Sequence, residues 1–175
     1  IYYHVSYWGR PHDYLWLGTF SPYLLHQQMK LAYDRGIQKM WVLNVGDIKP
    51  AEYQIELFLD MAWNIDEVNE IGVTAHLKSW LGREFGSNCA EELLPAMEAH
   101  YHLSYIRKPE FMGNTREEER DPKYKVIKDL PWSEQTISER LRSYTILSDV
   151  VERMESNIPA DRQDAYFQLV KYPVQ

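Results

Sequence analysis

Only two segments of the 175-residue chain carry the pattern of a β-strand, and both lie within its first 45 residues. Residues 1–8 are β-branched and aromatic, and residues 39–45 contain the apolar run Met40 to Leu43. A helical pattern separates them, beginning with Ser21-Pro22 and ending near Gly36. Strand-helix-strand order at this spacing predicts two adjacent parallel strands, with the second buried on both faces by helices.

The rest of the chain predicts helices. We expect them over residues 50–64, 74–85, 89–108, 133–154 and 160–171. Asn88 and Glu91 resemble a capping box for the third of these helices, and Pro95 is expected to kink it. The last two should form a helical pair. Since two parallel strands cannot make an ordinary sheet, we interpret the chain as part of a larger α/β domain, mostly α by content, that continues into a helical bundle.

Composition narrows the function classes. The net charge of −7 argues against a nucleic-acid binder, and no apolar run reaches the length of a membrane span. The chain has 6 Trp and 13 Tyr against 5 Phe, and rings with a polar group tolerate half-exposed positions. Such rings are typical both of sugar-binding sites and of an aromatic core, and composition leaves the two open.

Ligands of α/β domains gather where the strands end. His4 and Tyr7 lie on the first strand, and Asn44 ends the second one. An Asn at the end of an apolar run indicates either a hydrogen bond to a ligand or a structural bond to a neighbouring loop. Asp13 and Asp47 are secondary candidates near the same ends, although Asp47 also suits the position before the helix that starts at Pro50.

Other chemistry is poorly supported by the sequence. We find no metal-binding spacing of His or Cys, no phosphate-binding glycine loop and no nucleophile elbow, so we expect no metal and no cofactor. Cys89 at a helix start indicates either a thiol of lowered pKa or an inert buried one, of which the second is commoner.

Several segments resemble a known family. The most specific are Asn44-Val45-Gly46-Asp47-Ile48-Lys49-Pro50 and Phe58-Leu59-Asp60-Met61-Ala62-Trp63-Asn64, and Ile1 to Gly9 also matches. These segments resemble glycoside hydrolase family 115, the xylan α-1,2-glucuronidases. The resemblance covers most of the chain except residues 113–130.

The resemblance implies the end of a (β/α)8 barrel over residues 1–110, a connection over 111–132 and the start of a helical bundle over 133–175. It implies an inverting enzyme that removes (4-O-methyl-)glucuronic acid from glucuronoxylan or aldouronic oligosaccharides, secreted or periplasmic, with His4, Tyr7 and Asn44 binding the glucuronate. The acid and base are expected upstream, in the rest of the parent polypeptide, so the chain alone should be inactive. A homodimer of the parent is a further expectation.

Two alternatives remain. The chain can be a non-catalytic carbohydrate-binding or helical interaction module derived from such an enzyme. It can also belong to a different barrel hydrolase that uses its own carboxylates, such as Asp13 and Asp47.

Overall fold

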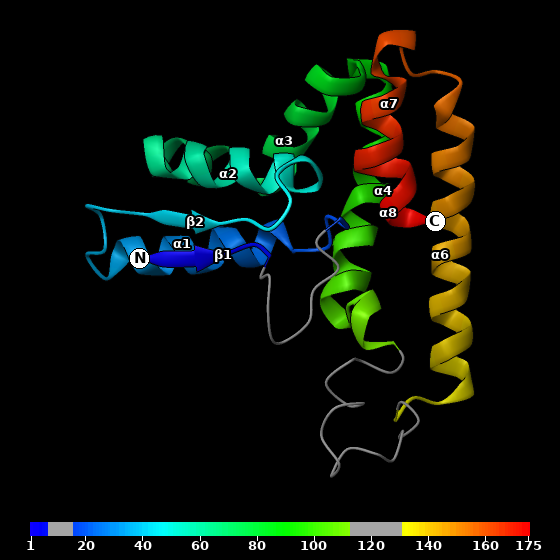
Figure 1. The fold of residues 1–175 in the computed structure, drawn as a ribbon, viewed down its shortest axis with the longest axis horizontal. Helices are drawn as coiled ribbons and strands as arrows, with labels where there is room; N and C mark the ends of the chain where they lie inside the picture. The colour runs from blue at the N-terminus through cyan, green and yellow to red at the C-terminus, as the bar shows by residue number, and fades with distance from the viewer. Residues whose placement is uncertain (7–15, 113–130) are drawn as a thin grey trace.

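The computed structural model describes residues 1–6, 16–112 and 131–175. Within these ranges the chain is mainly helical, with one small sheet near its N-terminus (Figure 1). The predicted site residues Tyr7 and Asp13 lie outside the described residues. No helix within these ranges combines the length and the apolar composition of a membrane span.

The sheet consists of β1 (Tyr2–His4) and β2 (Val42–Asn44), which pair in parallel as predicted. Helix α1 (Pro22–Asp34) connects them, and the Ser21 hydroxyl caps it by accepting a hydrogen bond from the Leu24 amide at 3.4 Å. Both strands are shorter than the sequence pattern predicted. Tyr3 lies opposite Leu43 and His4 opposite Asn44.

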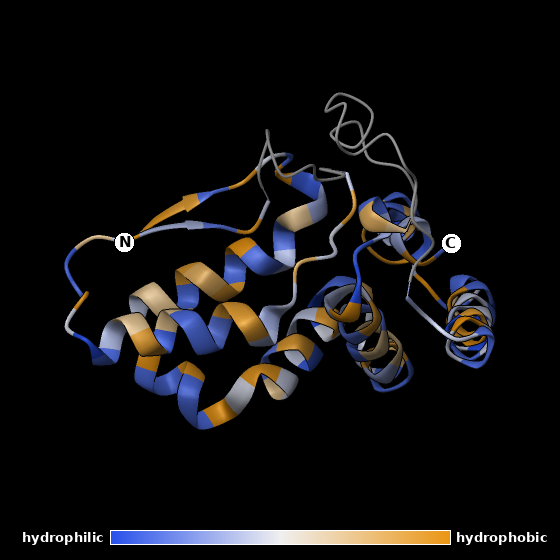
Figure 2. Ribbon diagram, turned by 90° about the horizontal axis from the view of Figure 1, so that it is seen from below, coloured by the Kyte–Doolittle hydropathy of each residue, from blue (hydrophilic) through white to orange (hydrophobic). Residues whose placement is uncertain are grey.

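The expectation that helices cover both faces of the second strand is wrong for the described residues. Tyr3 and Val5 are buried on the face toward the helices, and the Tyr3 hydroxyl donates to Gln28 on α1 at 2.5 Å. On the other face, Tyr2 and Val42 keep 60% and 41% of their surface exposed. The two strands lie at the edge of the molecule (Figure 2), because the helix after each strand packs on the same side of the sheet.

The middle of the chain forms three long helices. They are α2 (Glu52–Trp63), which follows the 3₁₀ turn η1 (Lys49–Ala51), α3 (Ile65–Phe85) and α4 (Ser87–Ile106). Helix α4 contains Pro95 without ending there, and the short turn η2 (Pro109–Phe111) follows it.

Two helix starts differ from the sequence prediction. Residues 65–73 were not expected to be helical. The non-helical backbone of Asn64 ends α2, and its side chain caps a new helix by accepting from the Glu67 amide at 3.3 Å. Gly72, with φ of 77°, kinks α3 and interrupts the pattern. The capping box at Asn88 does not form, because Gly86 with φ of 96° is the N-cap of α4, two residues before Asn88.

The C-terminal part is the predicted helical pair. Helix α6 (Glu134–Glu155) is capped by Ser133. Its partner runs through η4 (Ala160–Arg162), α7 (Gln163–Tyr166), the π-helical η5 (Phe167–Lys171) and α8 (Tyr172–Val174). The partner was expected to end at Pro173, but α8 includes this residue at a first-turn position, where a proline needs no amide hydrogen. The buried Tyr166 hydroxyl joins the pair by donating to the Val151 carbonyl at 2.7 Å.

One cluster of buried side chains runs through the described chain, from Tyr3 on β1 to Val174 on α8. Its fully buried members include Leu25, Leu57, Leu77 and Leu93, one from each of the helices α1 to α4. Helix α6 joins this core mainly through α4. The division of the chain into a barrel part and a bundle part stays a prediction.

Candidate functional site

The sheet brings together two of the predicted site residues, His4 and Asn44. They end neighbouring parallel strands, lie directly opposite each other and occupy the face of the sheet that points away from the helices. The Asn44 side-chain nitrogen Nδ2 lies 3.0 Å from His4 Nδ1. The sequence left open whether Asn44 binds a ligand or a neighbouring loop. In the structure its side-chain partner is the other candidate residue.

Further contacts hold the strand ends in place. The Val5 amide donates to the Asn44 carbonyl at 3.1 Å, and the Gly46 amide donates to the Ser6 hydroxyl. The Tyr2 ring meets the His4 ring edge-on, with 4.8 Å between the ring centroids. The imidazole is therefore fixed by a ring on one side and an amide on the other.

The loops that follow the two strands also touch. Gly18 packs so tightly against the turn at Pro50 that it has no room for a side chain.

His100 on α4 is fully buried, and its burial lowers the pKa of the imidazole from 6.5 to about 4. The imidazole of His100 is therefore neutral near pH 7 and buried within the protein.

The secondary candidate Asp47 is exposed. Asp47 does not cap the turn that follows it. The 3₁₀ turn η1 begins at Lys49, its N-cap residue is Ile48, and no side chain caps it. Tyr7 and Asp13 cannot be placed, since they lie outside the described residues. The alternative hydrolase that uses Asp13 and Asp47 as a catalytic pair therefore gains no geometric support.

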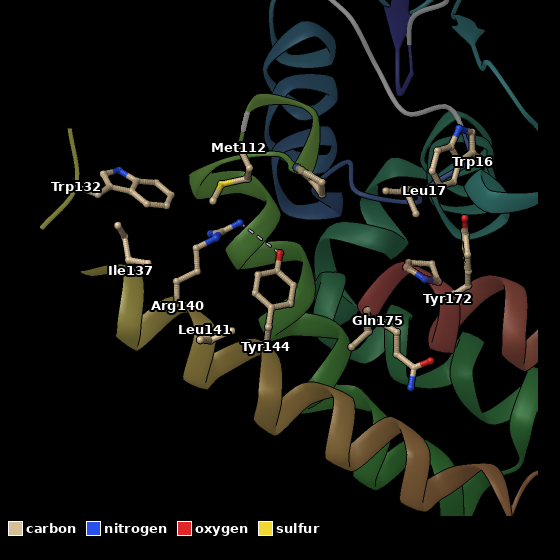
Figure 3. A pocket seen from close by; sticks show the side chains of 13 residues that line it. Trp16, Leu17, Met112, Trp132, Ile137, Arg140, Leu141, Tyr144, Tyr172 and Gln175 are labelled. Carbon is tan, nitrogen blue, oxygen red and sulfur yellow. Dashed lines mark hydrogen bonds between the residues drawn. The ribbon is translucent and has the colours of Figure 1, made fainter. Parts of the chain in front are cut away.

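An apolar groove of about 590 Å³ lies along α6 (Figure 3). Trp132 lies at one end, Trp16 and Tyr172 lie together at the other, and Tyr144 lies between them. The sequence analysis did not single out this group, because its members are scattered over residues 16 to 175.

Arg140 is the charged residue among those that line this groove. Its guanidinium donates to the carbonyl oxygens of Leu103 and Arg107 at 3.0 and 2.8 Å, at the end of α4. It also lies 5.1 Å from the centre of the Tyr144 ring and 5.5 Å from that of Trp132. Arg140 therefore ties α6 to the C-terminal end of α4.

A second cluster that the sequence analysis missed joins α2 to α3. One ligand-type atom each from Glu56, Asp60 and His76 lies within 4.8 Å of the others. The Asp60 carboxylate lies 3.0 Å from His76 Nε2, and Glu56 pairs with Arg83. The buried His76 Nδ1 has no hydrogen-bond partner, whereas a metal-bound histidine normally donates from its second nitrogen. We interpret the cluster as a polar bridge between the two helices.

Cys89 is buried in the first turn of α4, and its thiol lies 3.6 Å from the Asn157 carbonyl oxygen. Burial raises the pKa of this thiol, which contradicts the interpretation of a lowered pKa and agrees with that of a buried cysteine.

Comparisons with known proteins agree on one family. The model of glycosyl hydrolase family 115 matches residues 1–111. A solved structure described as a novel family GH115 4-O-methyl-α-glucuronidase, with specificity for decorated arabinogalactans, is 70% identical in sequence and superimposes with a TM-score of 0.92. The similarity covers 99% of this chain and 23% of that one. No curated protein sequence matches the chain.

Proposed function

Because the chain belongs to glycosyl hydrolase family 115, we propose that it is the part of an α-glucuronidase that binds the uronic acid. The observation that carries this proposal is the His4–Asn44 pair, held at adjacent ends of two parallel strands on the face away from the helices. Strand ends are where α/β enzymes bind ligands. A histidine, an amide and the hydroxyl of Tyr7 suit a carboxylate and sugar hydroxyls.

The remaining strands of the sheet belong, in this proposal, to the rest of the parent protein. This chain spans 23% of the solved relative. Tyr2 and Val42 stay exposed on the face that carries His4 and Asn44. Further parallel strands that continue the sheet into a (β/α)8 barrel would enclose this face, since the helices of such a barrel lie outside and its strand ends surround the active site.

We propose hydrolysis with inversion in the complete protein. One carboxylic acid protonates the departing sugar oxygen, and a carboxylate removes a proton from the attacking water on the opposite side. We place both carboxyl groups in the rest of the parent. His4, Tyr7 and Asn44 then position the glucuronate, and the chain alone is inactive.

The next question is which polymer carries the glucuronic acid that the enzyme removes. The 70% identical relative is a 4-O-methyl-α-glucuronidase with specificity for decorated arabinogalactans. This identity favours an arabinogalactan as the first candidate substrate, and α-1,2-linked glucuronoxylan or its aldouronic oligosaccharides as the second. Both polymers carry the same (4-O-methyl-)glucuronic acid, so the uronate contacts serve either one.

A secreted or periplasmic location fits such polymeric substrates, and homodimerisation of the parent remains part of the proposal. The apolar groove along α6 supports a second candidate function, a carbohydrate-binding or helical interaction module. The exposed rings of Trp16 and Tyr172 in this groove could stack against a sugar. Arg140 already donates its hydrogen bonds to the carbonyls at the end of α4.

The test uses the full-length protein that contains this chain. It is incubated with 4-O-methylglucuronic acid-decorated arabinogalactan, with glucuronoxylan, and with each polymer after chemical removal of its uronic acid. We expect release of free 4-O-methylglucuronic acid, faster from the arabinogalactan. NMR of the freshly released sugar should show the β-anomer first, as inversion of an α-linkage requires. Binding to all four polymers without release would favour the module instead.

A further inference from the structure

His4 and Asn44 form a hydrogen bond whose polarity follows from the chemistry of the two groups. The atom of Asn44 that faces His4 is Nδ2, at 3.0 Å from Nδ1. A carboxamide nitrogen only donates, so Nδ1 accepts with its lone pair. A neutral imidazole that accepts at Nδ1 carries its proton on Nε2.

We propose that Asn44 is a positioning residue that holds His4 in the Nε2–H form, so that His4 offers the uronate an N–H donor. This inference rests on the proposed function and assigns different tasks to two residues that the sequence analysis treated alike. Asn44 acts on the substrate through His4, and the hydrogen-bonding group that meets the sugar is His4 Nε2–H.

The surroundings of the pair fix the geometry on which this depends. The Tyr2 ring stands edge-on to the imidazole, at an interplanar angle of 89°. The backbone at Asn44 is anchored by the Val5 amide, and that at Gly46 by the Ser6 hydroxyl.

A second His–Asn pair in the chain provides an internal comparison. On α1 and α3, the side-chain oxygen Oδ1 of Asn69 lies 2.8 Å from His26 Nε2. Here an oxygen faces the ring, so His26 donates from Nε2. Removal of Asn69 should therefore alter the His26 signals and leave those of His4 unchanged.

The experiment is nitrogen-15 NMR of the histidine rings, selectively labelled, in the full-length protein that contains this chain, at a pH where His4 is neutral. Wild-type His4 should show Nε2 protonated and Nδ1 unprotonated. A hydrogen bond of ordinary net strength, ~1 kcal/mol, shifts a tautomer ratio about fivefold. Asn44→Ala should lower the ratio of Nε2–H to Nδ1–H by about this factor. Asn44→Asp should reverse it, because a carboxylate accepts only and draws the proton to Nδ1.

Asn69→Ala is the matched control, and we expect the His4 signals to keep their wild-type values in it. A proton on Nδ1 of wild-type His4 would overturn the inference, and the wild-type spectrum alone decides this even if the Asn44 variants do not fold. An unchanged His4 ratio in a folded Asn44→Ala variant would also overturn it. If the tautomer is as stated but the full-length protein releases no uronic acid, the proposed function fails and the assignment of the pair stands.

Discussion

Gly18 and Pro50 approach each other so closely that a Cβ atom on Gly18 would lie 2.5 Å from the Pro50 carbonyl oxygen. The two residues belong to the segments that follow β1 and β2. This contact joins the segments that follow the two strands. The glycine is needed for space, and the neighbour that it avoids is backbone, which cannot rotate away.

We therefore predict that Gly18→Ala destabilises the chain by about 1–3 kcal/mol, the usual cost of forcing an atom into a packed site. Gly82→Ala on α3 is the control, because its Cβ would meet its nearest neighbours at an ordinary 3.9 Å. That change should be neutral or stabilising by up to about 1 kcal/mol. Urea unfolding of both variants gives the comparison, and equal stability of the two would contradict the packing argument.

The buried His100 predicts a dependence of stability on pH. Its pKa is about 4 in the folded chain, against 6.5 for an exposed histidine. Between these values the unfolded chain binds a proton that the folded chain does not. The contribution of His100 is thus complete above pH 6.5 and is lost, at up to about 1.4 kcal/mol per pH unit, as the pH falls toward 4.

The measurement is the free energy of unfolding between pH 4 and 7.5 for the wild type and for His100→Gln. The variant should lack this part of the acid slope, whereas His102→Gln, which changes an exposed histidine of the same helix, should keep it. A slope that stays the same in His100→Gln would mean that other groups cause the acid sensitivity.

Arg140 predicts a stability effect at the junction of α4 and α6. Arg140→Met removes two hydrogen bonds from a charged donor to the Leu103 and Arg107 carbonyls, and should cost about 1.5–3 kcal/mol. Arg142→Met removes an exposed arginine from the same helix and should change stability by less than about 0.5 kcal/mol. Thermal melts of the two variants test this, and similar melting temperatures would show that Arg140 does not join the helices.

The isolated 175-residue chain should release no measurable uronic acid. An acid and a base each contribute about 10²–10⁴-fold in general acid–base catalysis, and we place both in the rest of the parent. The assay compares the chain with the full-length protein on the same decorated polymer at equal molar concentration. Turnover by the chain at the rate of the full-length protein would require its own carboxylates to act, and would revive the Asp13 and Asp47 hypothesis.

Much of the fold was readable from local patterns. The run Met40 to Leu43 and the helix after Ser21-Pro22 predicted the parallel pair, and the apolar stripe of α6 predicted the helical pair. The start of α3 could not be predicted from the sequence. Asn64 both ends one helix and caps the next, and Gly72 interrupts the helical spacing of the apolar residues. One-sided burial of the sheet was also missed, since an apolar run does not tell which elements of a longer protein cover it.

The site was predictable in part. Pairing of His4 with Asn44 follows once the two strands are placed in parallel with their ends level. The hydrogen bond between their side chains depends on a register that no short motif specifies. The cluster of Glu56, Asp60 and His76 had a weak signal in the four-residue spacing of its carboxylates on one helix face. His76 comes from α3, and no pattern in the sequence indicated that it joins these carboxylates.

The central claim is that His4 and Asn44 serve the sugar more than the fold. The most direct test is kcat/KM of the full-length protein on a 4-O-methylglucuronic acid-decorated oligosaccharide, with His4→Ala, Asn44→Ala and the control His102→Ala, together with thermal melts. The hydrogen bond from His4 to the sugar is lost directly in His4→Ala and weakened through the loss of its positioning partner in Asn44→Ala. A loss of ~1–3 kcal/mol predicts a roughly 5- to 150-fold decrease, with Asn44→Ala toward the lower end, the melting temperature kept and the control unaffected. Wild-type kcat/KM in both variants, or lost activity that accompanies a collapsed melting temperature, would contradict the claim.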